Sequence, residues 1–469
     1  MRVLYLAIGF IFIGVSCKLM PRQDAQKDTK EKRTTMDRGK TDWIHTTSIY
    51  EVNIRQYTPE GTFKAFAAAL PRLKDMGVQT LWFMPVTPIA KEKRKGTLGS
   101  YYACSDYTSV NPEFGTLQDF QQLVKEAHTM GFKVIIDWVA NHTGWDHVWT
   151  KQHPDYYLHD SDGRFHAASG MDDIIELDYK NPALRKAMID AMKFWIQQAD
   201  IDGFRCDLAS WVELDFWQEA RPQLDAVKPL FWLGEFDELE NPDYGKVFQA
   251  SYSWKWMHKT EEFFKQKQPL SELYDLLLQY NTIGDSSMRA WFTSNHDENS
   301  WNGTEYEKYG PLAVPLAVFS CTWNGVPLIY SGQELPLKDK RLQFFDKDPI
   351  PWPSKDISRE NGLELQEFYK VLLHLHAGNP ALRGGDPSVV TYKLTTTADD
   401  KVFAYLRKNG NDEVLVVLNF SGDGPLHFKI TDTHLSGGFV NAFSGAAGKF
   451  TAGNDFELPP YGYLVYVKQ

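Results

Sequence analysis

The segment GFRCD, residues 203–207, contains the side chains best suited to chemistry in this chain. Its composition predicts a short buried strand that ends in a carboxylate. Side chains alternate along a strand, so Arg205 and Asp207 are expected on one face and Cys206 on the other. The neighbouring arginine favours the ionised form of Asp207 and lowers its pKa, which suits a carboxylate nucleophile. A structural arginine–aspartate pair would leave the same pattern, and other segments must separate the two interpretations.

Two further carboxylates follow other strand-like segments. Glu235 comes at the end of the apolar run FWLGE, and Asp297 ends the segment NHD. In a barrel of parallel strands and helices, catalytic groups lie at the C-terminal ends of the strands. We therefore expect Asp207, Glu235 and Asp297 to converge in one site, which favours catalysis over a structural ion pair.

Strand-like runs alternate with helix-like segments between residues 48 and 377, and this alternation predicts a (β/α)8 TIM barrel. An open doubly wound sheet is the alternative, but it would require a glycine-rich phosphate loop after an early strand, and the sequence has none. The eight predicted strands are 48–57, 80–89, 133–142, 203–210, 231–236, 250–256, 288–297 and 325–334.

The predicted barrel is one of several parts of the chain. Residues 143–180 carry little periodicity and are expected to form a loop domain inserted after the third strand, on the C-terminal face, where long loops are usually functional. Short alternating strands separated by Gly, Asn and Asp turns predict a C-terminal antiparallel β-sandwich, with strand segments at 389–397, 402–409, 413–421, 426–431, 438–444 and 462–468. The predicted division is 1–17 signal peptide, 18–41 flexible tether, 42–378 barrel with its inserted loop domain, and 379–469 β-sandwich.

The N-terminus has the pattern of an export signal. Arg2 is followed by 13 apolar residues, 3–15, too few to span a bilayer. The following GVSC is similar to a bacterial lipoprotein box, in which Cys17 would be lipidated. This predicts an exported, membrane-anchored lipoprotein on the periplasmic or cell-surface side; ordinary secretion with cleavage nearby is the alternative.

Composition limits the partners and the redox chemistry. The formal net charge of −11 argues against nucleic acid, because phosphate contacts require clusters of Lys and Arg. Cys104, Cys206 and Cys321 are spaced too widely for a metal site and are predicted to be buried free thiols. A single Cys104–Cys321 disulfide is the alternative.

Taken together, these segments resemble the alpha-amylase family, glycoside hydrolase family 13. The resemblance covers about residues 45–469 and implies a retaining glycosidase that cleaves α-glucosidic bonds in starch-like polysaccharides or malto-oligosaccharides and requires no cofactor. The segments that carry it occur in the family's order and are GSYYACSDYTSVNPEFGT (99–116), DWVANH (137–142), ELDY (176–179), GFRCD (203–207), GE (234–235) and NHD (295–297).

The resemblance implies a role for each carboxylate. Asp207 corresponds to the nucleophile that forms a covalent glycosyl-enzyme. Glu235 corresponds to the general acid/base, and burial after its apolar run would raise its pKa and keep it protonated. Asp297 corresponds to the third carboxylate, which binds sugar hydroxyls and favours the distorted sugar.

Other residues are implied to bind substrate. Tyr102 corresponds to the tyrosine that stacks under the sugar, with Tyr101 as an alternative. His142 and His296 correspond to histidines that hydrogen-bond the same sugar, although either could instead be a buried structural histidine. Arg205 belongs with this group because it would hold Asp207 ionised.

The chain departs from the family in places that affect the substrate and the metal. Trp211 replaces the His or Lys common four residues after the nucleophile and could stack on an acceptor sugar. Ala103 replaces an Asp found in many relatives. Asn141 and Asp178 match calcium ligands of many members, but Ca²⁺ prefers six to eight oxygens, so structural calcium is a candidate rather than a requirement.

Three functions therefore compete. The first is hydrolysis. The second is an α-glucan transglycosylase that uses the same intermediate, as Trp211 suggests. The third is a non-catalytic, lipid-anchored glycan-binding protein, which the three intact carboxylates disfavour. A metal-dependent hydrolase is disfavoured as well, because the first predicted strand lacks the His-x-His pair typical of such barrels.

Overall fold

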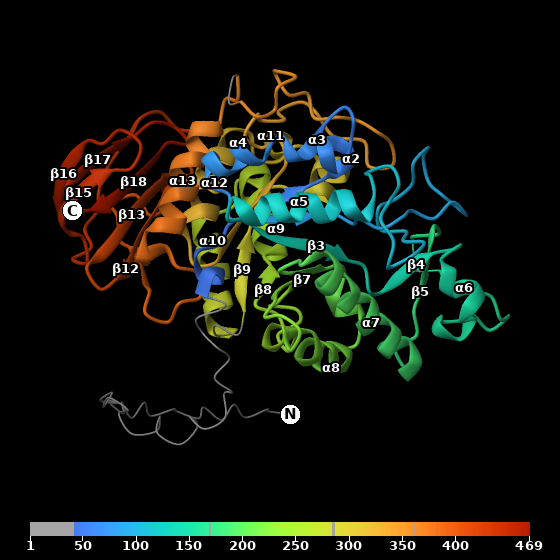
Figure 1. Ribbon diagram of the computed structural model, residues 1–469. Coiled ribbons are helices and arrows are strands. Elements are labelled where there is room, and N and C mark those ends of the chain that lie inside the picture. The colour runs from blue at the N-terminus through green and yellow to red at the C-terminus, as the bar shows by residue number, and fades with distance from the viewer. Residues whose placement is uncertain (1–41, 168–169, 284–286, 360–361) are drawn as a thin grey trace, which may run out of the picture. The chain divides into compact units, whose positions relative to one another are not determined.

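Eight parallel strands close into a barrel in the order β1-β10-β9-β8-β7-β6-β3-β2. Figure 1 labels four of them, β3, β7, β8 and β9, among the surrounding helices. This computed structural model describes residues 42–167, 170–283, 287–359 and 362–469, so the predicted signal peptide, Cys17 and the tether lie outside the described residues. The predicted barrel is confirmed, and each predicted strand overlaps one observed barrel strand. The strands are β1 Ile49–Val52, β2 Thr80–Phe83, β3 Lys133–Trp138, β6 Gly203–Cys206, β7 Phe231–Asp237, β8 Ala250–Tyr252, β9 Met288–Trp291 and β10 Val326–Tyr330.

Helices follow the strands and form the outer layer of the barrel. Local sequence fixes several of their ends: Thr116 and Asp119 form a capping box at the start of α5, and Asn181 followed by a proline begins α7. The α-helices are α2 Ile54–Tyr57, α3 Phe63–Ala67, α4 Leu70–Met76, α5 Leu117–Thr129, α6 Val148–Gln152, α7 Pro182–Ala199, α8 Leu214–Asp225, α9 Trp254–Gln266, α10 Leu270–Ile283, α11 Glu305–Tyr309, α12 Ala313–Thr322 and α13 Gln366–Gly378. None of the helices in the described ranges is both long and apolar enough to cross a membrane.

Short 3-10 and π turns connect these elements. The 3-10 turns are η1 Asp42–Thr46, η2 Pro154–Tyr156, η3 Ala209–Trp211, η4 Tyr244–Lys246, η6 Gly310–Leu312 and η7 Pro380–Leu382, and the π-helix is η5 Glu298–Asn302.

Side chains fill the interior of the barrel. Trp82 on β2, Ile135 on β3, Leu233 on β7 and Leu328 on β10 belong to one buried apolar cluster inside the ring of strands. A second, larger cluster packs the helices against the outside of the strands. The barrel is therefore a solid support, and a site can form only at its ends.

The segment after β3 forms a small excursion. Strands β4 (His142–Gly144) and β5 (Ile174–Glu176) pair antiparallel. The Gly144 N–H donates to the carbonyl of Cys104 at 2.8 Å, which joins β4 to the long loop after β2. A side chain at Gly144 would collide with Ala90, so only glycine permits this close approach. The two loops consequently act as one wall at the top of the barrel.

The C-terminal part is antiparallel, as predicted. A six-stranded sheet has the order β11-β12-β13-β18-β15-β16, and a two-stranded sheet, β14-β17, contributes Phe428 and Phe456 to the same apolar cluster. The predicted segments did not include β16 and β17. The strands are β11 Val390–Leu394, β12 Val402–Asn409, β13 Asp412–Asn419, β14 Leu426–Lys429, β15 Ser436–Asn441, β16 Ala447–Thr451, β17 Asp455–Leu458 and β18 Tyr463–Lys468.

The three cysteines of the described residues are buried free thiols, so the alternative Cys104–Cys321 disulfide is wrong. Cys206 lies in the helix–strand core outside the barrel, on the side of β6 opposite to Arg205, as strand alternation predicts.

Candidate active site

Arg205 on β6 connects the carboxylates at the top of the barrel. Its Nη1 atom lies 2.7 Å from Asp207 and 3.0 Å from Asp137 on β3, and its Nη2 atom lies 3.0 Å from Glu235 on β7. The guanidinium is fully buried above the ring of Trp82, 5.1 Å from its centre. One arginine therefore holds Asp207 and Glu235 as close neighbours on adjacent nitrogens.

Leu208 joins the same two carboxylates through the backbone. This residue follows Asp207 directly and has a left-handed conformation, with φ 42° and ψ 45°. That conformation is costly for a branched side chain and is found mainly at functional sites. Here it directs the Leu208 N–H to Glu235 Oε2 at 2.8 Å.

The electrostatics of Asp207 differ from the expectation. Burial raises the pKa of Asp207 above the usual carboxyl value, and Arg205 lowers it only in part, so the predicted net decrease is wrong. The physical reason is that one guanidinium charge is shared by three carboxylates. Burial likewise raises the pKa of Glu235, against the opposing charge of Arg205.

His296 is the second cation of the site. Its Nδ1 lies 2.5 Å from Glu51 on β1, and its Nε2 lies 2.8 Å from the Tyr102 hydroxyl and 3.4 Å from Asp297. Burial alone would lower the pKa of His296, but Asp297 and Glu51 outweigh it and raise the pKa to about 9. Both ring nitrogens already have protein partners, which fits a positioning role for His296, and the predicted contact with sugar stays a prediction.

Tyr102 is held between the two cations. Its hydroxyl donates to Asp137 at 2.9 Å, and its ring stacks on His296 with centroids 5.2 Å apart. Tyr101 instead lies under the guanidinium of Arg55 and does not line the cavity above the three carboxylates. Of the two candidate tyrosines, Tyr102 is the one that a ligand could contact.

A cavity of about 460 Å³ opens above these residues. Asp207, Glu235 and Asp297 all line it, so the three predicted carboxylates do converge. Tyr102 and His142 line it too. The other lining residues are Lys95, Ser100, Met171, Asp173, Ile174, Leu208, Trp301, Phe344 and Phe345.

His142 is suited to contact a ligand in this cavity. Burial lowers its pKa to about 4, so the ring is neutral at ordinary pH. Within the described ranges its Nε2 atom has no hydrogen-bonding partner, whereas Nδ1 lies 3.3 Å from the Asn141 amide. A buried nitrogen of this kind is costly unless a ligand or water satisfies it.

Three predicted substrate-binding residues, His296, Arg205 and Trp211, lie outside the lining. His296 lies directly behind it, against Tyr102 and Asp297. Arg205 is buried beneath the cavity and acts on the carboxylates, and Trp211 in η3 is 51% exposed without lining the cavity. The sequence analysis missed Glu51 and the aromatic group Trp301, Phe344 and Phe345. The position of Trp301, four residues after Asp297 as Trp211 is four after Asp207, is a signal that could have identified it.

The candidate calcium ligands do not form a complete set. The Asn141 amide faces His142, and Asp178 accepts the Lys180 N–H at 3.1 Å. Two oxygens fall well short of the six to eight that Ca²⁺ takes. No group of three or more His, Cys, Asp or Glu side chains that could hold a metal occurs in the described part of the chain. These residues alone do not fit a calcium site.

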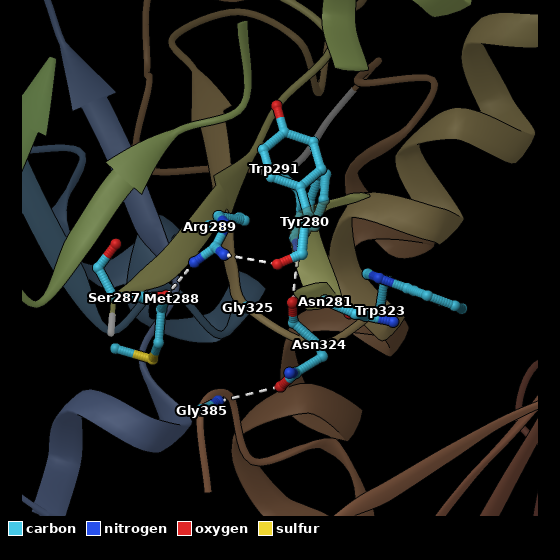
Figure 2. A pocket seen from close by; sticks show the side chains of 10 residues that line it. All are labelled: Tyr280, Asn281, Ser287, Met288, Arg289, Trp291, Trp323, Asn324, Gly325 and Gly385. Carbon is cyan, nitrogen blue, oxygen red and sulfur yellow. Dashed lines mark hydrogen bonds between the residues drawn. The ribbon is translucent and has the colours of Figure 1, made fainter. Parts of the chain in front are cut away.

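A second cavity lies at the opposite end of the strands, where β9 begins and just before β10. Figure 2 shows Arg289 bonded to the carbonyls of Ser287 and Tyr280, while the Asn324 side chain accepts the Gly385 N–H at 3.0 Å. This space measures about 20 Å³, enough for one water molecule and too small for a substrate. The 460 Å³ cavity is the one that the three carboxylates line, and it is therefore the candidate active site.

A closed parallel barrel with three carboxylates at its C-terminal face is compatible with a glycosidase-type enzyme. Two family models match the chain: "Alpha amylase, catalytic domain" over residues 23–167 and 155–388, and "Maltogenic Amylase, C-terminal domain" over 392–465. The chain belongs to the alpha-amylase family and is an α-glycosidase of that family.

Individual relatives agree with this assignment. Alpha-amylase 3 of Dictyoglomus thermophilum is 23% identical over 445 residues, which cover 81% of this chain and 85% of that protein. A cyclomaltodextrin glucanotransferase of Geobacillus stearothermophilus is 28% identical over 83% of this chain and 59% of its own length. The crystal structure of a maltogenic alpha-amylase from Thermotoga neapolitana superimposes with a TM-score of 0.80 at 29% identity and covers 91% of this chain and 99% of that one.

The Glu51–His296 pair predicts an unusual titration. His296 should stay an imidazolium at pH 7.5 and titrate near pH 9, and replacing Glu51 by Gln should lower that pKa, because one of the two carboxylates that raise it loses its charge. Because the folded state binds this proton more tightly than the unfolded state, protonated His296 stabilises the fold. The contribution is complete below about pH 6.5, the pKa of an unfolded histidine, and is lost as the pH rises through about 9. Histidine-selective ¹⁵N NMR measures the protonation state directly.

His376 provides the internal control for that measurement. It is equally buried but bonds to the Cys321 carbonyl, and burial lowers its pKa to about 4. Its signal should remain that of a neutral ring from pH 6 to 9 in both proteins. A neutral His296 at pH 7.5 would contradict the assigned charge.

Proposed function

We propose that this enzyme is a retaining glycoside hydrolase that cleaves α-glucosidic bonds in starch-like polysaccharides or malto-oligosaccharides. One observation carries the proposal: Asp207 and Glu235 share one guanidinium at the edge of a 460 Å³ cavity, with Asp297 on the same cavity. Retaining enzymes need two carboxyl groups about 5 Å apart so that one can attack directly, and a shared arginine favours such an arrangement.

The proposed reaction has two displacements. Asp207 attacks the anomeric carbon as the bond to the leaving oxygen breaks, and Glu235 gives its proton to that oxygen. The Glu235 carboxylate then takes a proton from water, whose oxygen attacks the same carbon and releases Asp207. Two inversions retain the α configuration. No cofactor is required for these steps.

The surroundings of each carboxylate support these roles. The raised pKa of Glu235 favours the protonated acid in the resting enzyme. Asp297 has a side chain 37% exposed toward the cavity and could accept hydrogen bonds from sugar hydroxyls. The free Nε2 of neutral His142 offers a further contact, and the Tyr102 ring offers an apolar face for the reacting sugar.

Transfer to a second sugar is the alternative outcome of the same intermediate. Trp211 favours it, because an indole that is 51% exposed, four residues beyond Asp207, could hold an acceptor sugar in place of water. The similarity to a cyclomaltodextrin glucanotransferase supports the same alternative.

We also propose that the enzyme is exported and anchored to a membrane by lipid on Cys17, on the periplasmic or cell-surface side. The support is sequence alone: Arg2, the 13 apolar residues 3–15 and GVSC at residues 14–17. The polar segment 18–41 would then separate the enzyme from the lipid surface.

Replacement of the two central carboxylates should separate their roles. Asp207→Asn should lower kcat on malto-oligosaccharides and on an aryl α-glucoside at least about 10³-fold, because no covalent intermediate forms. Glu235→Gln should lose activity on malto-oligosaccharides yet keep the first step with an aryl α-glucoside, whose leaving group needs no acid. Initial rates, together with ¹H NMR of the first anomer released by the wild type, provide the measurement.

Asp237→Asn is the matched control. Asp237 is also buried on β7, two residues from Glu235, but it bonds to Tyr280 and to backbone N–H groups away from the cavity. Its replacement should leave kcat within a few-fold of the wild type. Full activity of Asp207→Asn, or a β anomer as first product, would disprove the retaining mechanism proposed.

Maltotriose products distinguish hydrolysis from transfer. If Trp211 binds an acceptor, the wild type should form oligosaccharides longer than maltotriose, and Trp211→Ala should reduce the ratio of longer to shorter products several-fold, because the acceptor loses its apolar contact. Chromatography of early time points measures that ratio. Only shorter products from the wild type would exclude transfer.

Lipid attachment predicts membrane fractionation that depends on one residue. The full chain expressed in a bacterial host should partition with membranes and incorporate labelled fatty acid, and Cys17→Ser should remove both properties. Fractionation followed by mass measurement of the N-terminal peptide checks this. A soluble wild type, or a membrane-bound Cys17→Ser variant, would contradict the anchor.

A further inference from the structure

Two tryptophans in the described residues are unusually exposed, and both follow a carboxylate of the site. Trp211 is 51% exposed and Trp301 is 50% exposed, each four residues after Asp207 or Asp297. Of the two, only Trp301 lines the large cavity. A large apolar face left uncovered at the rim of a cavity is typical of a binding surface.

Trp301 belongs to a continuous group of aromatic rings. Its ring centre lies 5.2 Å from Phe344 and 5.5 Å from Phe345, and both phenylalanines are half-buried lining residues. Phe344 is stacked with Tyr102 at 6.3 Å and an interplanar angle of 18°. We call Trp301, Phe344 and Phe345 the aromatic wall. It continues the face of Tyr102 along the lining of the cavity.

Barrel order sets the side of the cavity on which the aromatic wall lies. Phe344 and Phe345 follow β10, which stands opposite β6 in the ring of eight strands, whereas Glu235 follows β7, the neighbour of β6. A leaving group must lie on the side of the acid that protonates it. Trp301 follows β9, the strand next to β10, so all three residues of the aromatic wall come after strands that are not neighbours of β7. We therefore assign the aromatic wall to the side of the donor chain.

The aromatic wall is held in place before any ligand binds. Trp301 is part of the π-helix η5, whose first residue, Glu298, forms a buried ion pair with Lys308. Asn299 accepts the Leu342 N–H at 2.8 Å and donates to the Lys340 carbonyl, which ties η5 to the loop after β10. Such π-helical turns occur frequently at functional sites. A rigid surface of this kind loses little entropy when it binds.

We propose that the aromatic wall is a sugar-binding subsite that holds a second glucosyl ring of the α-glucan, on the non-reducing side of the cleaved bond. The C–H face of a pyranose would pack on the exposed face of Trp301, and Phe344 and Phe345 would close the contact. This inference rests on the proposed function for the identity of the ligand, and it makes Trp301 a determinant of substrate length.

Binding in an inactive background tests the subsite without turnover. In Asp207→Asn protein, adding Trp301→Ala should raise the Kd of maltopentaose about tenfold, within the range expected for loss of one aromatic contact. Trp301→Phe, which keeps a ring, should stay within about threefold. Titration calorimetry measures all three proteins. An unchanged Kd in Asp207→Asn/Trp301→Ala overturns the proposal.

Trp43→Ala is the matched control. Trp43 is another partly buried tryptophan, but it packs on Phe231 and Lys133, the first residues of β7 and β3, at the opposite end of the barrel. Its replacement should leave the Kd of maltopentaose within about twofold. A tenfold increase for Trp43→Ala as well would show a general loss of structure and overturn the assignment to the aromatic wall.

Turnover separates this inference from the proposed function. In otherwise wild-type protein, Trp301→Ala should lower kcat/KM about tenfold on maltopentaose and leave it within about twofold on an aryl α-glucoside, which has only the ring that is attacked. Equal losses on both substrates would overturn the subsite. A wild type that turns over no α-glucan would disprove the proposed function, and the Kd values would still decide the subsite.

Discussion

The buried contact between one guanidinium and three carboxylates governs this molecule. Arg205 on β6 lies within 3.0 Å of Asp137, Asp207 and Glu235, which come from β3, the end of β6 and β7. Buried charges are costly unless they are paired, so the three strand ends are stable only with the arginine between them. The packed barrel interior, with Trp82 beneath the guanidinium, leaves Arg205 no space below the level of the carboxylates. The residues that line the cavity lie directly above this layer of charged groups.

The balance of charge then sets protonation. In the described part of the chain, five carboxylates at this layer are paired with two cations, Arg205 and His296. The carboxylates are Glu51, Asp137, Asp207, Glu235 and Asp297. Burial raises the pKa of Glu235 and that of Asp207, while the carboxylates around His296 keep its pKa near 9. Burial and this shortage of positive charge together favour a protonated Glu235, the state that its proposed role as general acid requires. They also explain why an arginine two residues away in the sequence does not by itself depress the pKa of Asp207.

Substrate choice belongs to the loops rather than to the strands. The barrel supplies the carboxylates, whereas the cavity wall comes from segments after β2, β3, β9 and β10. Hydrogen bonds from Asn299 join the last two, and the close contact at Gly144 joins the first two. The loops therefore form two rigid walls, one built on β4 and β5 and one aromatic. The strand ends carry the residues that define the family, and under the proposed subsite the aromatic wall sets the length of glucan accepted.

The sequence by itself determined the barrel and its carboxylates. Buried strands appear as short apolar runs, and in a parallel barrel their C-terminal residues must share one face, so Asp207, Glu235 and Asp297 could be placed together from local pattern and motif order alone. Short antiparallel strands such as β16 and β17 were missed because their apolar pattern is weak. Only the tertiary structure paired Glu51 with His296, 245 residues away, brought Trp301 to Phe344, and chose Tyr102 over Tyr101. Burial and charge sharing depend on groups that meet only after the barrel closes. The pKa of Asp207 and the exposure of a tryptophan therefore cannot be predicted from neighbouring residues in the sequence.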